Sequence, residues 1–130
     1  MPTGWKKTLE RSRLRVSCSI ISRMAKQHYF FKLIAPRPTF PMDITEDERR
    51  LMAEHSRYTA ERFAAGDLLI YGPVMAPAGA FGAAVLEVTS EEEVRRFGEN
   101  DPSVKAGLNK FEYYPMKVAQ ARAKEPGAGA

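Results

Sequence analysis

The sequence predicts an α+β domain in which four strands form an antiparallel sheet and two main helices cover it. Short runs of aromatic and β-branched residues alternate with helical patterns, in the order strand, helix, strand, strand, helix, strand. Proline, glycine or a helix-capping residue separates each stretch from the next. The 130 residues, 44% of them hydrophobic, suffice for one domain with a single core.

The first strand and the first helix carry local signals at their ends. Residues 28–34 (HYFFKLI) have the composition of a strand, which Pro36 ends. Thr45 is a candidate N-cap, and Glu48 lies three residues further on, which is the spacing of a capping box. A long helix is therefore expected from this point to a stop at Gly66.

A hairpin and a second helix follow. Residues 68–74 and 81–88 are expected to be paired strands, joined by a loose, turn-rich loop over residues 76–79. Ser90 repeats the capping-box spacing with the glutamate three residues after it. This predicts a second helix that begins at about residue 91 and stops near the glycine at position 98.

The last part of the chain predicts a short helical turn and an edge strand. Asp101 and Pro102 suit the N-cap and first position of a turn that ends at Gly107. Residues 110–118 (KFEYYPMKV) form the fourth strand, and Pro115 inside it cannot donate a ladder hydrogen bond. That places the strand at the edge of the sheet, as in the split βαβ, ferredoxin-like arrangement βαββαβ.

Both faces of the predicted sheet carry apolar side chains. In the first strand, Tyr29, Phe31 and Leu33 alternate with Phe30 and Ile34. Two helices cover only one face, so the other face would be a large exposed apolar patch. We expect this open face to pack on a second copy of the chain in a homodimer, or else to line a ligand cavity.

The net charge of +4 does not indicate a nucleic-acid-binding surface. Residues 1–23 carry six basic residues and one acidic residue, whereas residues 24–130 carry 14 basic and 15 acidic residues. The body of the protein is therefore almost neutral, and binding to phosphates requires positive charge concentrated on the folded domain. We expect no nucleic-acid partner.

The ends of the chain differ in character from the middle. Residues 1–23 read as a basic extension, expected to be disordered, that is either an organelle presequence or translation from a start upstream of Met24. The domain is expected over residues 24–122, followed by a flexible tail over residues 123–130.

Composition also argues against a membrane-spanning, disulfide-bonded or metal-binding protein. No apolar run reaches the 18 or so residues of a membrane span, a single cysteine (Cys18) allows no internal disulfide, and no His or Cys pair has metal-ligand spacing. We expect a soluble, cytoplasmic protein with no metal, no cofactor and no membrane partner, with organelle import possible if residues 1–23 are a presequence.

His55 is the strongest candidate for acid–base chemistry. It falls within the apolar stripe of the long helix, three residues after Met52 and three before Tyr58, so its ring is expected to face the sheet. A neutral imidazole can act as a base if a carboxylate fixes its tautomer. Asp101 is the candidate partner. On sequence alone, a single inward-facing histidine is more often a satisfied core residue, and an Asp-Pro pair at a helix start is a routine cap.

The loop after the first strand and the end of the second strand suggest a binding site. Arg37 has the planar fork that binds carboxylates, and Phe40 could form an apolar wall, although Arg37 could also be a solvated surface residue. Gly72 permits close backbone approach beside Pro73, which suits either a pocket floor or a bend.

Several short motifs over residues 26–118 together resemble the YciI-like (YCII-related) family. They are Pro36-Arg37-Pro38-Thr39-Phe40, Met52-Ala53-Glu54-His55 followed by Tyr58, Gly72-Pro73-Val74, Pro77-Ala78-Gly79, and Asp101-Pro102 followed by Lys105 and Gly107. One departure is Ala76 before Pro77, where this variant of the family is expected to have Asp. The first 23 residues have no counterpart in the family.

The resemblance implies a dimeric α/β barrel of ferredoxin-like type whose active site is a His–Asp pair, here His55 and Asp101. It further implies a cofactor-independent lyase or isomerase, or a hydrolase, acting on a small cyclic or aromatic acid. The expected substrate-binding residues are Arg37, Phe40, Tyr58, Gly72 and Pro73. The alternatives are a non-catalytic, small-molecule-binding or accessory dimer and, with less support, a haem- or quinol-directed monooxygenase on the same fold.

Overall fold

The computed structural model describes residues 26–122, and the predictions for the basic extension, Met24 and the tail lie outside this range. Seven elements follow one another, and their order confirms the predicted βαββαβ pattern with an added short helix. They are β1 (Gln27–Ile34), α2 (Glu46–Ala64), β2 (Leu68–Ala76), β3 (Gly79–Val88), α3 (Glu91–Glu99), α4 (Pro102–Lys105) and β4 (Lys110–Pro115).

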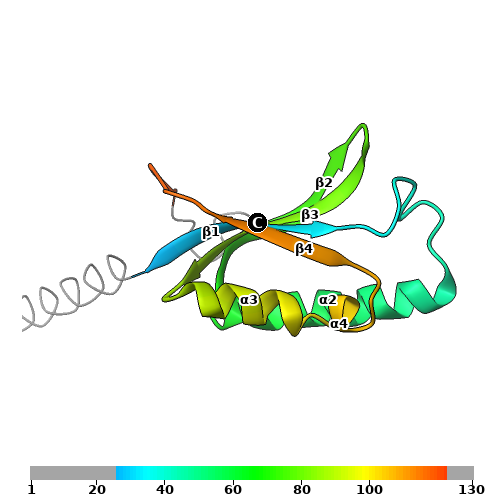
Figure 1. Cartoon of the computed structure of the whole chain (residues 1–130), viewed down its shortest axis with the longest axis horizontal. Coiled ribbons are helices and arrows are strands. Elements are labelled where there is room, and N and C mark those ends of the chain that lie inside the picture. The colour runs from blue at the N-terminus through cyan, green and yellow to red at the C-terminus, as the bar shows by residue number, and fades with distance from the viewer. Residues whose placement is uncertain (1–25, 123–130) are drawn as a thin grey trace, which may run out of the picture.

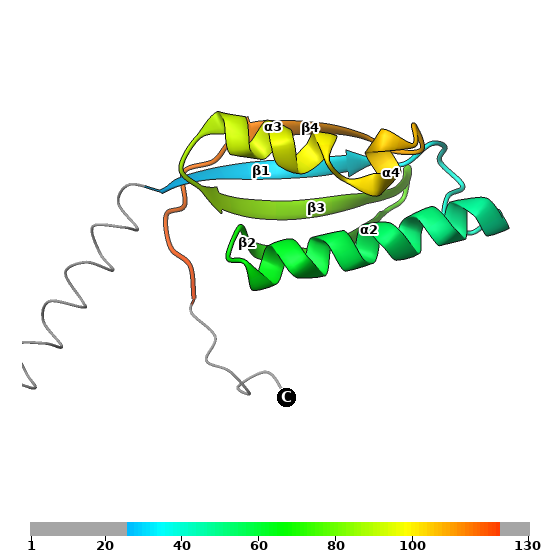
Figure 2. The same cartoon turned by 90° about the horizontal axis from the view of Figure 1, so that it is seen from below.

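The four strands form one antiparallel sheet in the order β2-β3-β1-β4. The helices lie on one side of it, with α2 beneath the β2–β3 half and α3 beneath β1 and β4 (Figures 1 and 2). This confirms the edge position predicted for the last strand. The strand itself ends at Pro115, three residues earlier than predicted, although the backbone N–H of Met116 still donates to the carbonyl of His28 at 2.9 Å. No helix within residues 26–122 is long and apolar enough to cross a membrane.

The β2–β3 hairpin is tighter than the sequence indicated. Ala76 pairs directly with Gly79, so only Pro77 and Ala78 form the tip, and the prediction of a loose loop was wrong. Gly79 adopts a φ of +138°, and a Cβ atom there would lie 3.2 Å from the Cα of Pro38. The hairpin therefore reaches its tight geometry because glycine lets it pack against the loop that follows β1.

Local capping signals set the ends of α2. The Thr45 side chain accepts from the backbone N–H of Glu48, and the Glu48 carboxylate accepts from the N–H of Thr45, which completes the predicted capping box. At the other end, Gly66 has a φ of +95°, the left-handed conformation expected of a glycine directly after a helix.

An aromatic cluster joins the sheet to α3. Phe31 stacks on Phe111 at 5.4 Å between ring centroids and meets Phe97 edge-on at 4.9 Å. The helix α3 ends at Glu99, one residue after Gly98, which confirms the predicted stop near this glycine. Its role is packing, because a Cβ atom at position 98 would lie 2.5 Å from the ring of Phe111.

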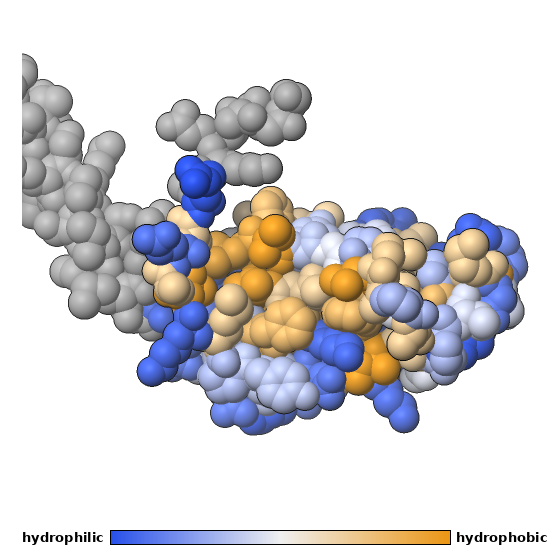
Figure 3. Space-filling model, turned by 90° about the horizontal axis from the view of Figure 1, so that it is seen from above, coloured by the Kyte–Doolittle hydropathy of each residue, from blue (hydrophilic) through white to orange (hydrophobic). Residues whose placement is uncertain are grey.

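The face of the sheet away from the helices carries exposed apolar side chains at both edges. Ile70 of β2 is 67% exposed, and Val74 of β2 and Tyr114 of β4 are also exposed. Two polar pairs also lie on this face, His28 with Glu87 at 3.0 Å and Lys32 with Glu112 at 3.9 Å. Figure 3, a view onto this face, shows hydrophobic and hydrophilic surface interleaved.

Candidate functional site

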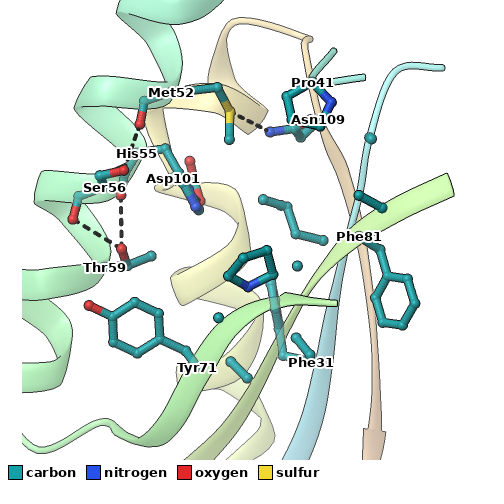
Figure 4. A pocket seen from close by; sticks show the side chains of 18 of the residues that line it. Phe31, Pro41, Met52, His55, Ser56, Thr59, Tyr71, Phe81, Asp101 and Asn109 are labelled. Atoms are coloured by element: carbon teal, nitrogen blue, oxygen red, sulfur yellow. Dashed lines mark hydrogen bonds and ion pairs between the residues drawn. The ribbon is translucent and has the colours of Figure 1, made fainter. Parts of the chain in front are cut away.

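A pocket of about 420 Å³ lies between α2, the helix-covered face of the sheet and the loop that joins β1 to α2. Ligand pockets have volumes of roughly 300–1,000 Å³, so this one suits a small molecule. Its lining is mainly apolar and includes Phe31, Leu33, Phe40, Ile44, Tyr71 and Phe97. The polar side chains that reach it include His55, Asp101 and Asn109, grouped beside Met52 of α2 (Figure 4).

The structure brings together the two residues that the sequence paired. His55 lies on the inner side of α2, one turn after Met52, and its side chain is 18% exposed. Asp101 caps the N-terminus of α4 and is 1% exposed. Nδ1 of His55 donates to Oδ2 of Asp101 at 2.6 Å, although 46 residues separate them in the chain. That the pair is catalytic stays a prediction.

Ser103 holds the Asp101 carboxylate in place. Its backbone N–H donates to Oδ1 at 2.8 Å, and its hydroxyl donates to the same oxygen at 2.7 Å. Oδ1 therefore accepts two hydrogen bonds, and Oδ2 faces Nδ1 of the His55 ring. An ionised carboxylate can only accept, so with Asp101 ionised the proton in the His55–Asp101 bond belongs to Nδ1 and Nε2 carries the lone pair.

Arg37 is bound by two acidic side chains of the protein. Its Nε donates to both carboxylate oxygens of Asp43, at 2.9 and 3.0 Å, and its terminal nitrogens donate to both oxygens of Glu48, at 2.7 and 2.8 Å. These bonds lower the pKa of Asp43 and hold the pKa of Glu48 at about 2. Arg37 does not line the pocket, so these contacts favour a structural role; its predicted role as an anion anchor stays untested.

Of the other residues expected to bind substrate, Phe40, Gly72 and Pro73 line the pocket. No heavy atom lies within 4 Å of a Cβ built at Gly72, so this glycine borders open space and not a closely approaching backbone segment. Tyr58 does not line the pocket; its hydroxyl donates to the carbonyl of Phe97 at 2.7 Å. Burial, and secondarily the Asp101 charge, raise the pKa of Tyr58 to about 12, so the phenol stays protonated.

Sequence reasoning missed two polar residues of the site, Ser103 and Asn109. Ser103 is fully buried, and Asn109 is 3% exposed. Neither belongs to a recognisable motif, because their positions depend on how the turn around α4 folds back onto α2. A weak signal existed for Asn109, a polar residue between the glycine that ends the turn and the last strand.

The arrangement can move a proton, using one imidazole nitrogen that a buried carboxylate orients. Within residues 26–122 no group of three or more His, Cys, Asp or Glu side chains could hold a metal ion. The chemistry that the described side chains themselves supply is general acid–base chemistry in a largely apolar pocket.

Solved structures resemble this fold. The 5-chloro-2-hydroxyhydroquinone dehydrochlorinase of Burkholderia phenoliruptrix, in complex with 2,5-dihydroxybenzoquinone, is 24% identical with a TM-score of 0.51, over 68% of this chain and 93% of that one. An uncharacterized protein from Thermotoga maritima is 12% identical with a TM-score of 0.47, over 71% of this chain and 99% of that one. No curated protein matches the chain.

A family model gives the sequence-level relationship. The model of the YCII-related domain matches residues 29–117, which is more than half of the chain and contains every strand and helix described above apart from the first two residues of β1. His55 and Asp101 both lie within the matched region. The chain therefore belongs to the YCII-related family.

Proposed function

We propose that this protein is a cofactor-independent lyase or isomerase that removes a proton from a small cyclic or aromatic compound. The observation that carries the proposal is the 2.6 Å hydrogen bond from His55 to the buried carboxylate of Asp101, at the wall of an apolar pocket. A histidine so oriented can act as a general base, and such bases contribute about 10²–10⁴-fold to a rate.

In this proposal, Nε2 of His55 takes the proton and Asp101 stabilises the imidazolium that forms. The electron pair left on the substrate either expels a leaving group, which gives a lyase, or moves within the ring before the proton returns at another atom, which gives an isomerase. The pocket supports this chemistry because apolar walls keep water away from the base.

Two observations support a substrate with a single ring. The dehydrochlorinase with the same fold acts on a chlorinated hydroxyhydroquinone, and its solved complex holds a quinone of one ring. A pocket of about 420 Å³ suits a molecule of that size. The sequence analysis suggested an acid, whose carboxylate Arg37 could bind. Arg37 is bound by Asp43 and Glu48 of the protein itself, and the proposed proton transfer does not require a carboxylate on the substrate.

The test is proton exchange between solvent and a panel of small substrates. The wild type would be incubated in D₂O with cyclic diketones, lactones and dihydroxybenzenes, and NMR would follow deuterium incorporation. We expect exchange or elimination on at least one compound, reduced about 10²–10⁴-fold by His55→Gln. His28→Gln is the matched control, because His28 pairs with Glu87 on the far face of the sheet and should not affect the rate.

The main alternative is a non-catalytic binding module that uses the same apolar pocket. It predicts that ring compounds bind and raise the melting temperature, while none undergoes exchange in the wild type and His55→Gln changes nothing but affinity. That result would refute the proposed catalysis.

We also propose that two copies pair through the open face of the sheet. Its exposed apolar residues favour burial, and two of its acidic side chains, Glu87 and Glu112, already have partners in His28 and Lys32. Sedimentation equilibrium should show a dimer for the wild type and a monomer for Ile70→Glu, which introduces an unpaired charge on this face. The same substitution at the exposed Met42 is the control, and a monomeric wild type would contradict the pairing.

A further inference from the structure

Asn109 is a buried polar residue of the pocket for which the acid–base pair gives no role. It lies between α4 and β4 and is 3% exposed. Within residues 26–122, the polar contact of its carboxamide is a donation from Nδ2 to the sulfur of Met52 at 3.4 Å. A thioether is a weak acceptor, and buried amides usually have stronger partners. The carboxamide is therefore available to a ligand.

The backbone fixes this carboxamide relative to the acid–base pair. The N–H of Asn109 donates to the carbonyl of Ser103 at 3.1 Å. Ser103 is also the residue whose N–H and hydroxyl hold Asp101. Ser103 therefore contacts both Asp101, whose carboxylate orients His55, and the backbone of Asn109.

The distance between the amide and the base suits a single ring. Met52, which the amide touches, precedes His55 by three residues on α2, a rise of roughly 4.5 Å along the helix axis. Both side chains project from the inner face of the helix, and Figure 4 shows Met52, with Asn109 beside it, and His55 along the same side of the pocket. A ligand in this pocket can therefore contact the amide of Asn109 and the ring of His55 at the same time.

We propose that Asn109 binds an oxygen of the substrate, a ring carbonyl or hydroxyl, through its Nδ2 hydrogens. This rests on the proposed function. When His55 takes a proton from the carbon next to a carbonyl, the C–H electron pair forms the C=C bond and the carbonyl π pair moves to oxygen. Asn109 donates a hydrogen bond to that oxygen, whose negative charge it stabilises.

The same geometry favours an uncharged substrate with an oxygen over a carboxylate. The pocket already holds the buried negative charge of Asp101, and a second anion nearby would oppose the neutral form of His55 that a base requires. Asn109 offers a neutral dipole, which fits a carbonyl or phenol.

The side-chain amide of Asn109 reports directly on this contact in ¹H–¹⁵N correlation spectra of the full chain. The Asn109 signals are identified by their absence in Asn109→Leu. Hydroquinone, catechol and cyclohexanone are the oxygen-bearing probes, and p-xylene, which has the shape of hydroquinone without its oxygens, is the matched control ligand. We expect at least one oxygen-bearing probe, and not p-xylene, to shift these signals downfield.

Affinities provide the second readout. Asn109→Leu should weaken binding of that probe about tenfold, the loss of one hydrogen bond, and leave p-xylene binding unchanged. Asn100→Leu makes the same substitution at an exposed residue and should change neither affinity. Signals that respond to none of the three probes, or equally to p-xylene, would overturn the assignment.

The outcome is separable from that of the proposed function. If the amide shifts but wild-type exchange is absent, the catalytic proposal fails and the Asn109 contact stands. If exchange depends on His55 while Asn109→Leu exchanges normally and the amide does not move, the assignment of Asn109 alone fails. Should Asn109→Leu not fold, the wild-type titration with p-xylene as control still decides, with Asn109→Asp used to identify the signal.

Discussion

Replacing Asp101 with asparagine should reverse the tautomer of His55 while leaving the fold intact. Oδ1 of Asp101 accepts two hydrogen bonds from Ser103, and Oδ2 accepts one from Nδ1 of His55. Because the N–H of Ser103 requires an acceptor, the carboxamide of Asp101→Asn keeps its oxygen there and turns its NH₂ toward His55. Nδ1 must then accept, which places the ring proton on Nε2 and removes the base.

The expected magnitudes differ sharply between activity and stability. Loss of the base should lower the exchange rate by about 10²–10⁴-fold. The substitution keeps the shape and exchanges charge-assisted hydrogen bonds for neutral ones, so the free energy of unfolding should fall by only about 1–2 kcal/mol. Asp101→Leu, which leaves the buried N–H of Ser103 without an acceptor, should cost about 3 kcal/mol.

Deuterium incorporation into the active panel compound measures the rate, and urea unfolding measures the stability. Asp67→Asn is the matched control, because Asp67 pairs with Arg62 at the surface and should leave the rate unchanged. An undiminished rate in the folded Asp101→Asn variant would refute the role assigned to Asp101.

Two predictions concern packing and the loop beside the pocket. Gly98→Ala should lower the free energy of unfolding by about 1–3 kcal/mol, because its Cβ would lie 2.5 Å from Phe111, whereas Gly72→Ala has open space and should change it by less than about 0.5 kcal/mol. Equal losses in urea unfolding would contradict this. Arg37 lowers the pKa of Glu48 from 4.5 to about 2, so its stabilisation is present above pH 4.5 and is lost as the pH falls toward 2. The melting temperature of Arg37→Gln should therefore fall less than that of the wild type between pH 5 and pH 2.5, and parallel curves would contradict the ion pair's role.

Local sequence signals predicted the order of the elements because each acts within one turn or one strand. The capping box at Thr45 and the glycine at position 66 are examples, since both depend only on residues adjacent in the chain. The edge position of β4 also followed from a single residue, Pro115, which cannot take part in a central ladder.

Features that depend on distant contacts could not be predicted in this way. The sequence predicted the end of a helix near Gly98, but it could not predict that the Phe111 ring packs against this glycine. The hairpin appeared loose because nothing in residues 76–79 reveals that Gly79 packs against Pro38. Arg37 looked available to a ligand because Glu48, its partner, was already assigned to the helix cap.

The residues of the candidate site were likewise predicted only in part from the sequence. Helical periodicity indicated that His55 faces inward. The Asp-Pro helix start made Asp101 a candidate partner, and the family resemblance supported the pair. Only the folded chain brings the two side chains to 2.6 Å. Asn109 escaped notice because a lone asparagine before a strand is typical of turns. Its contact with Met52 spans 57 residues of sequence, and no local rule predicts such a contact.

The tautomer of His55 tests the central claim most directly. Long-range ¹H–¹⁵N correlation spectra of the ring at neutral pH distinguish the two nitrogens, and Asp101 should hold the proton on Nδ1 and leave the lone pair on Nε2. We expect a protonated Nδ1 and an unprotonated Nε2. A proton on Nε2 instead, or a ring that averages freely between both forms, would show that Asp101 does not orient this histidine as a base.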